Sequence, residues 1–125
     1  MEGVMHRYVL YLLLSLSTTA GAAACLIESN DDQPPIRMCQ QNINIPAQLF
    51  NNSFCQPQLP ERSFDITFVD NCPTGAYGIC DNAQSEGVAY RQAIHYYSEP
   101  DDRPVLQAYC EQFSQGQWRT PTEEP

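Results

Sequence analysis

The nine residues CPTGAYGIC, at positions 72–80, are the stretch from which we predict the fold. Pro73 fixes its own backbone φ angle, Gly75 and Gly78 tolerate conformations that other residues avoid, and a cysteine stands at each end. These features predict a tight, covalently held turn that leads into a strand. The C-x7-C spacing fits neither the C-x-x-C of thiol oxidoreductases nor a zinc site. We therefore interpret the stretch as a structural clasp between two strands.

Strand patterns flank this stretch on both sides. Residues 63–69 alternate apolar and polar side chains, which predicts a half-buried strand. Residues 87–98 form the longest strand candidate and place Arg91, His95 and Tyr97 on one face. The other face of that strand carries Val88, Tyr90, Gln92, Ile94 and Tyr96. One face on a core and one partly wet face suit an antiparallel sheet.

Two segments have helical signals. Residues 43–55 have Pro46 in a first-turn position and apolar residues for one face, which predicts a short helix. Residues 99–104 combine acidic side chains with Pro104, a pattern typical of a helix entry. The helix that follows has an apolar face made of Leu106, Tyr109, Cys110 and Phe113. Gly116 predicts its end, and we expect Trp118 to pack back on the domain.

Residues 1–24 have the layout of a secretory signal peptide. His6 and Arg7 lie in the first part, residues 8–16 are almost wholly apolar, and residues 17–24 are all small. The apolar run is well short of the roughly 20 residues that a membrane-spanning helix needs. We therefore expect an exported protein, located in the periplasm or outside the cell.

The sequence around Cys25 leaves two routes of export open. Residues 22–24 are an A-x-A site for signal peptidase, but with Cys25 they also resemble a degenerate lipobox. A lipid on Cys25 would anchor the protein in the outer membrane, and the polar residues 26–35 would suit a flexible tether. Two features argue against lipidation. A lipobox normally has leucine at the position of Ala22, and it normally follows the apolar run directly, whereas the small residues 17–24 intervene in this chain.

The cysteine count bears on the same question. All six cysteines follow the signal peptide, and an even number in an exported chain suggests three disulfides. If Cys25 carried lipid, one of the remaining five, Cys39, would lack a partner within the chain, so parity favours no lipid. We expect Cys110 to pair with Cys80 or Cys72. The cysteines are Cys25, Cys39, Cys55, Cys72, Cys80 and Cys110.

The charge of the chain excludes some partners. The net charge is −9 and the chain contains no lysine, so its field repels nucleic acid and anionic lipid headgroups. We expect neither as a ligand, and membrane contact only through a lipid on Cys25. His95 is the one histidine after the signal peptide, and no cysteine pair has zinc-site spacing, so we expect no metal and no cofactor.

These patterns together predict a single α+β domain, with a small antiparallel sheet, one or two short helices and disulfide staples. We expect a signal peptide over residues 1–24, a flexible lead-in over 25–41, the disulfide-stabilised domain over 42–118 and a disordered tail over 119–125. A domain of this size buries only part of its apolar surface, so disulfides should supply a large share of its stability.

Four motifs give a resemblance to a known group of proteins. They are Cys-Pro-x4-Gly-x-Cys at 72–80, Tyr-Tyr-Ser at 96–98, Ala-Tyr-Cys-Glu at 108–111 and Gly-Gln-Trp at 116–118. This pattern resembles small cysteine-containing exported bacterial proteins, some of them predicted lipoproteins, whose function is unassigned. The resemblance covers about residues 52–118, and Gln117 replaces the second glycine of that group's last motif. It implies export and a disulfide scaffold, and it implies no reaction.

Two functions are compatible with the sequence. The many amphipathic aromatic residues favour a non-catalytic binding or structural protein for a protein, peptide or glycan ligand. The first candidate surface is the strand face with Arg91, His95 and Tyr97. The alternative is a small secreted hydrolase in which His95 acts with nearby carboxylates, but no serine lies in a G-x-S-x-G motif. We therefore name no catalytic residue.

Overall fold

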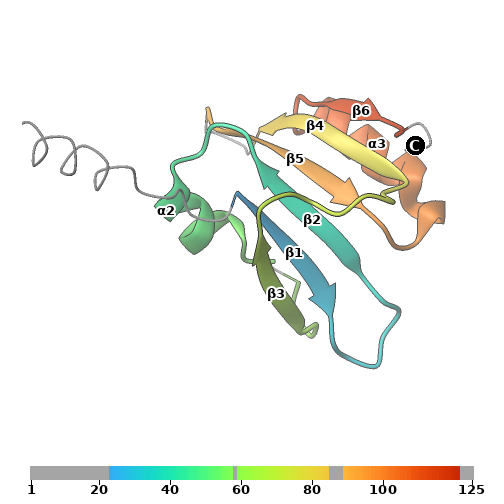
Figure 1. Cartoon of the computed structure of the whole chain (residues 1–125). Coiled ribbons are helices and arrows are strands. Elements are labelled where there is room, and N and C mark those ends of the chain that lie inside the picture. The colour runs from blue at the N-terminus through green and yellow to red at the C-terminus, as the bar shows by residue number, and fades with distance from the viewer. Residues whose placement is uncertain (1–22, 58, 85–88, 122–125) are drawn as a thin grey trace, which may run out of the picture.

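A six-stranded antiparallel sheet forms the centre of the protein (Figure 1). The computed structural model describes residues 23–57, 59–84 and 89–121. The strands are β1 (Ala24–Ser29), β2 (Arg37–Asn42), β3 (Phe64–Val69), β4 (Gly78–Gln84), β5 (Arg91–Tyr96) and β6 (Gln117–Arg119). Their order across the sheet is β3-β1-β2-β5-β4-β6. With its short helices and three disulfides, this sheet confirms the predicted disulfide-stapled α+β fold.

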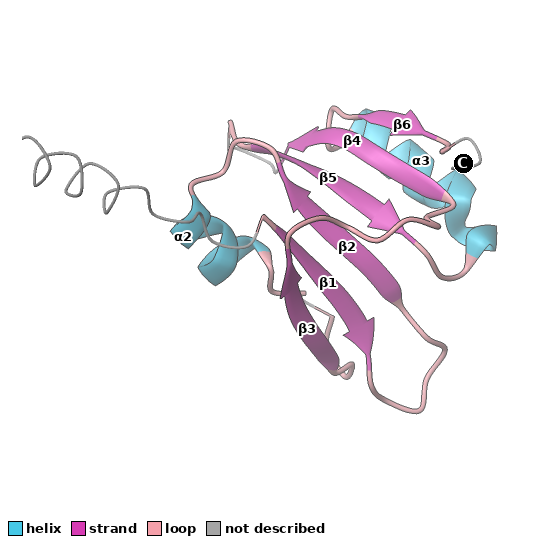
Figure 2. Cartoon of the chain, viewed as in Figure 1, coloured by secondary structure: helices cyan, strands magenta, loops and turns pink. Residues whose placement is uncertain are grey.

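Two helical units flank the sheet. Near one end, α2 (Ala47–Leu49) runs directly into η1 (Phe50–Phe54), which confirms helical structure within residues 43–55. In the C-terminal part, η2 (Pro100–Asp102) leads into α3 (Arg103–Gln112), with Pro104 in the first turn as predicted. Figure 2 shows α3 behind β4 and β6 and α2 at the opposite end of the sheet.

Two neighbouring rows of cross-strand partners define the faces of the sheet. The first row is Phe68, Cys25, Gln40, Ile94, Cys80 and Trp118. The second row is Thr67, Leu26, Cys39, His95, Ile79 and Arg119. Directly opposite residues of an antiparallel sheet point to one face, and successive residues point to opposite faces. The first row therefore lies on the face that η1 and α3 cover, the helical face, and the second lies on the opposite face, the loop face.

Each disulfide joins one cysteine of these rows to a segment that covers the sheet. The three pairs are Cys25–Cys55, Cys80–Cys110 and Cys39–Cys72. The first two hold the end of η1 and the helix α3 on the helical face, and the third holds the β3–β4 connection on the loop face. Cys110 pairs with Cys80, which is one of the two partners that the sequence predicted for it. Cys72 and Cys80 have different partners, so the stretch 72–80 is clasped to two other segments and not closed on itself.

Two small apolar clusters fill the helical face. One lies beneath η1 and the other beneath α3, each built around its disulfide. The buried members of the first are Cys25, Ile27, Ile45, Phe50 and Cys55. Those of the second are Cys80, Ala83 and Cys110, with Ile94, Tyr96 and Trp118 packed against them. The core is therefore divided between the two ends of the sheet.

The connection between β3 and β4 covers the loop face. Since β3 and β4 are separated by an even number of antiparallel steps, they run in the same direction, and residues 70–77 must return across the sheet. Figure 1 shows this segment passing in front of the strands. Besides its disulfide, the backbone N–H of Cys72 donates to Gln41 Oε1 (2.9 Å), and the Tyr97 hydroxyl donates to the Pro73 carbonyl (2.5 Å).

Residues 25–41 are not the flexible lead-in that their polar composition predicted. They hold most of β1 and all but the last residue of β2, two inner strands of the sheet, and Cys25 and Ile27 are fully buried. The breaker-rich part is only the turn between these strands. Asp31 in that turn accepts a hydrogen bond from Arg62 (2.8 Å), and this contact lowers the pKa of Asp31 to about 2.

Two other strands differ from the prediction in extent or exposure. β4 continues beyond the predicted turn as far as Gln84, because a bulge after Cys80 puts Asn82 at φ 58° and lets pairing with β5 resume. β3 is an edge strand, and its Ile66 and Phe68 are 36% and 46% exposed. The predicted strand is therefore present, but it is not half-buried, because no further described strand or helix covers the apolar side chains Ile66 and Phe68.

The predicted signal peptide and tail fall largely on residues outside the described ranges. Residues 1–22 and 122–125 are not described, nor are residues 85–88 at the start of the predicted long strand. At the C-terminal side, Arg119 belongs to β6, so the sheet extends one residue into the predicted tail.

Trp118 packs back on the domain, as predicted, by lying over Gly78. Its ring stacks on Tyr96 with a centroid distance of 5.8 Å, and burial raises the pKa of Tyr96 to about 12. A Cβ atom added to Gly78 would lie 2.0 Å from Cζ2 of Trp118. Gly78 is therefore required because the indole occupies the space that any side chain would take.

We predict that Gly78→Ala lowers the free energy of unfolding by about 1–3 kcal/mol, the usual cost of overpacking a filled site. Urea denaturation measures this change. Trp118→Leu is itself destabilising, but adding Gly78→Ala to it should cost much less, since the clash is gone. An equal cost of Gly78→Ala in both backgrounds would contradict the packing explanation.

We also predict that the paired change Cys39→Ser with Cys72→Ser destabilises the protein by about 3–4 kcal/mol, from the loop-closure entropy of a separation of 33 residues. Hydrogen exchange should then quicken at the backbone N–H of Cys72 and Tyr77, which both bond to the sheet. The matched control is Cys80→Ser with Cys110→Ser, which removes a disulfide of similar separation, 30 residues. In this control, hydrogen exchange at the same two backbone amides should stay slow. Equal exchange in both variants would show that the staples do not act locally.

Candidate functional site

A cleft of about 510 Å³ lies on the helical face, between α3 and the sheet. Its floor comes from β4 and β5, and its wall comes from the C-terminal end of α3 and the residues after it. The lining residues are Ala83, Gln84, Gln92, Ile94, Tyr109, Gln112, Phe113 and Ser114. We call this the α3 cleft.

The cleft forms because α3 is fixed over one edge of the sheet. Cys110 on the inner side of the helix is bonded to Cys80 of β4, and Trp118 of β6 packs in the same cluster. β5 is the next strand inward, and its Gln92 and Ile94 form part of the cleft floor. The helix therefore overhangs the sheet without closing on β5.

Two aromatic rings form the outer wall of the α3 cleft. Tyr109 and Phe113, one helical turn apart, stack with a centroid distance of 5.3 Å. They are 59% and 69% exposed, although the sequence placed them on the apolar face of the helix with the buried Cys110. An exposed stacked pair beside a cavity offers a flat apolar surface for a ligand.

Amide groups form much of the rest of the lining. Gln92 is only 8% exposed, and its Oε1 accepts a hydrogen bond from Nε2 of Gln40 (2.7 Å). This pairing fixes the orientation of the Gln92 amide at the floor of the cleft. Gln112 and Ser114 add polar groups at the rim. None of the described lining residues carries a formal charge at neutral pH.

A smaller pocket of about 220 Å³ lies on the loop face, beneath the β3–β4 connection. Residues 72–76 form its roof, and His95, Ile79 and Arg119 are among the residues beneath. Burial of the imidazole lowers the pKa of His95 below its usual 6.5, and the positive charge of Arg119 lowers it further. Asp81, which lies 3.7 Å from Arg119, has the opposite effect.

The structure does not bring Arg91, His95 and Tyr97 together as an open surface. All three belong to the loop face, but each is engaged separately. Arg91 donates through Nη1 to the carbonyl of Asn82 (3.0 Å), and the Tyr97 ring lies under the guanidinium of Arg37 (4.7 Å). The Tyr97 hydroxyl is bonded to the connection that crosses this face, and His95 lines the pocket beneath that connection, so the connection separates these side chains from Arg91.

The geometry offers little to the hydrolase alternative. Among the described residues, no hydrogen bond joins His95 to a carboxylate, and the acidic group whose charge acts on it is Asp81. Glu99 and Asp102, two carboxylates that are close to His95 in the sequence, lie instead by the entry to α3, where their charges act on Tyr77.

Sequence reasoning missed the α3 cleft, although it had located most of its parts. The strand pattern placed Gln92 and Ile94 on one face, and the helix pattern placed Tyr109 and Phe113 on one apolar face, but neither pattern indicated that these faces border a cavity. One signal could have located it. Tyr109 and Phe113 are two large rings at the end of a helix of only ten residues, α3, in which Cys110 is the buried residue.

The comparisons provide no relative for this chain. Protein-family models, curated proteins and solved structures were all compared with it, and none matches. Within the described ranges, no helix is long and apolar enough to cross a membrane, and no group of three or more His, Cys, Asp or Glu residues is placed to hold a metal ion.

We predict that His95 makes the protein less stable in mildly acidic solution. Because its pKa is lowered in the folded state, the unfolded chain binds the proton more readily, and stability falls as the pH drops below about 6.5. Above that pH both states hold neutral imidazole and the contribution vanishes. Comparing urea midpoints between pH 7 and pH 5 measures the slope, which His95→Gln should reduce. A slope unchanged in His95→Gln would refute the assignment.

Proposed function

We propose that this protein is an exported, non-catalytic binding protein that takes an uncharged, saccharide-like ligand in the α3 cleft. The observation that carries the proposal is the composition of that cleft, where an exposed aromatic pair faces side-chain amides and a hydroxyl with no formal charge among them. Sites of this kind bury an apolar face of the ligand and orient it through a few polar groups.

The lining favours an uncharged ligand over an ionic one. A charged group entering the cleft would lose water without meeting an opposite charge, which is unfavourable. Amide groups can both donate and accept hydrogen bonds, so Gln92 and Gln112 suit ligands that carry hydroxyl groups. The ring faces of Tyr109 and Phe113 suit the apolar face that a sugar ring presents.

The sheet beneath the cleft favours a saccharide over an extended peptide. Peptides commonly bind by adding a strand to an open sheet edge. At the α3 cleft, β5 is paired with both β2 and β4, and the backbone N–H of Gln84, at the end of β4, donates to the carbonyl of Ser114 (2.8 Å). β5 therefore offers no free backbone edge and this N–H of β4 is already used, so recognition there depends mainly on side chains.

Export is supported by two features. The first is the signal-like residues 1–24, and the second is the pairing of all six cysteines in disulfides. We place the protein in the periplasm or the cell envelope. Because the sulfur of Cys25 is bonded to Cys55, we do not propose the lipid-anchored form.

The test is an NMR titration of the exported, oxidised protein with maltotetraose, cellotetraose and chitotetraose. We expect saturable shifts at Gln92 and Ile94 with one of these probes, and about a tenfold weaker affinity in Phe113→Ala, the effect of losing one stacking contact. Phe68→Ala is the matched control, since Phe68 is also a half-exposed aromatic on the helical face but lies on β3.

Three outcomes would count against the proposal. Absence of saturable binding to all three probes would refute the saccharide class. Equal weakening by Phe68→Ala and Phe113→Ala would refute the location. Cleavage of a probe by the parent but not by His95→Gln would establish the hydrolase instead.

A further inference from the structure

We propose that signal peptidase cleaves this chain between Ala22 and Ala23, so that the exported protein begins at Ala23, two residues before Cys25. The inference rests on the proposed export. It differs from cleavage directly before Cys25, which the sequence of residues 22–24 favours. Cleavage before Cys25 would remove Ala23 and Ala24, and both residues take part in the sheet.

Ala24 is an integral residue of β1. It is fully buried and is the cross-strand partner of both Gln41 in β2 and Val69 in β3. Cleavage after Ala24 would remove this residue and make Cys25 the first one. Cys25 is also fully buried, so its new ammonium group would lie inside the sheet without a counter-charge.

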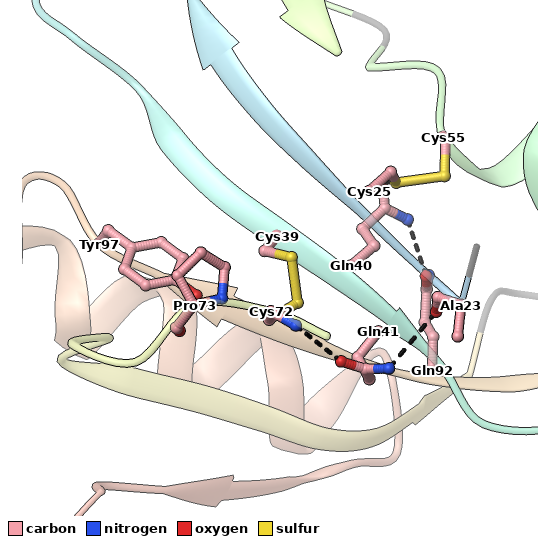
Figure 3. Close-up of a disulfide and its surroundings, with 10 residues drawn as sticks. All are labelled: Ala23, Cys25, Cys39, Gln40, Gln41, Cys55, Cys72, Pro73, Gln92 and Tyr97. Atoms are coloured by element: carbon pink, nitrogen blue, oxygen red, sulfur yellow. Dashed lines mark hydrogen bonds between the residues drawn. A yellow bond between two sulfur atoms is a disulfide. The ribbon is translucent and has the colours of Figure 1, made fainter. Parts of the chain in front are cut away.

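Ala23 is tied to the same region through its carbonyl group. That oxygen accepts hydrogen bonds from the backbone N–H of Asn42 (2.8 Å) and from Nε2 of Gln41 (3.4 Å). The same Gln41 side chain accepts, through Oε1, the N–H of Cys72 (2.9 Å). Figure 3 shows Gln41 between Ala23 and the disulfide-bonded Cys72. Loss of Ala23 would therefore free the amide that fixes the start of the β3–β4 connection.

The leader offers several bonds with small residues at the two positions that signal peptidase reads. Cleavage after Ala22, Ala23 or Ala24 would in each case leave a small residue at the last and third-last positions of the leader. Only cleavage after Ala22 keeps both the Ala23 carbonyl and the buried Ala24. Ala23 is only half-buried, so its new ammonium group can reach water.

This cleavage is also incompatible with lipidation of Cys25. A lipoprotein needs Cys25 as its first residue and its sulfur in a thioether. In the structure that sulfur is bonded to Cys55, beneath η1 and out of contact with solvent. A chain that begins at Ala23 satisfies neither requirement.

The test is secretion of the full chain, residues 1–125, from a bacterial host, with intact-mass measurement and N-terminal sequencing of the exported product. We expect a product that begins at Ala23 and has no alkylatable cysteine before reduction. A product that begins at Ala24 or at Cys25, or one that carries lipid on Cys25, overturns the inference and leaves export standing. A chain retained in the cytoplasm with residues 1–22 intact overturns export as well.

Two leader variants test the cleaved bond without changing the folded domain. Ala20→Gln places a large residue third-last before the Ala22–Ala23 bond, and should reduce the product that begins at Ala23 by tenfold or more. Gly21→Gln is the matched control, because it blocks only cleavage after Ala23, and the product should still begin at Ala23. An unchanged product from Ala20→Gln, or loss of the Ala23 product in Gly21→Gln, contradicts the proposed bond.

Discussion

Three disulfides placed in two adjacent rows of the sheet are the constraint on which the rest of the structure depends. Each joins a cysteine of an inner strand to a short segment that covers a face. Those segments are η1, α3 and the connection 70–77, and each is too short to bury much apolar area. A disulfide of this separation typically stabilises a fold by about 3–4 kcal/mol, a large share of the roughly 5–15 kcal/mol of a small domain. Covalent bonds therefore replace the large core that the chain lacks.

The position of these bonds also decides which surface is open. On the loop face, the Cys39–Cys72 bond holds the β3–β4 connection over the sheet, so Tyr97 is bonded to this connection and His95 lines the small pocket beneath it. On the helical face, the two disulfides hold η1 and α3 toward opposite ends of the sheet. The region between them has the paired amides of Gln40 and Gln92 at its floor. The α3 cleft forms because neither helical unit covers the part of the sheet beside α3.

The N-terminal strand gives the domain a boundary that composition does not reveal. β1 lies between β2 and β3, so its residues contribute to two ladders at once. A strand in that position cannot serve as a flexible tether, even though the turn that follows it is polar. The side chain of Gln41 donates to the carbonyl of Ala23, just before β1, and accepts from the backbone N–H of Cys72 in the connection 70–77. It therefore links the first strand to the segment that covers the loop face.

The sequence by itself determined the α+β class, the helices at both helical segments, the strand at β3 and the packing of Trp118, because periodicity, proline and glycine act locally. It limited the partner of Cys110 to Cys80 or Cys72, and the fold decided between them. Tertiary structure alone decided the strand order, the other two disulfides, the inclusion of residues 25–41 in the sheet and the exposure of Tyr109 and Phe113. These depend on which strand lies beside which, over separations of about 30 residues. Local pattern cannot say whether an apolar helix face meets the sheet or overhangs it, and here the position of the Cys80–Cys110 bond makes that choice.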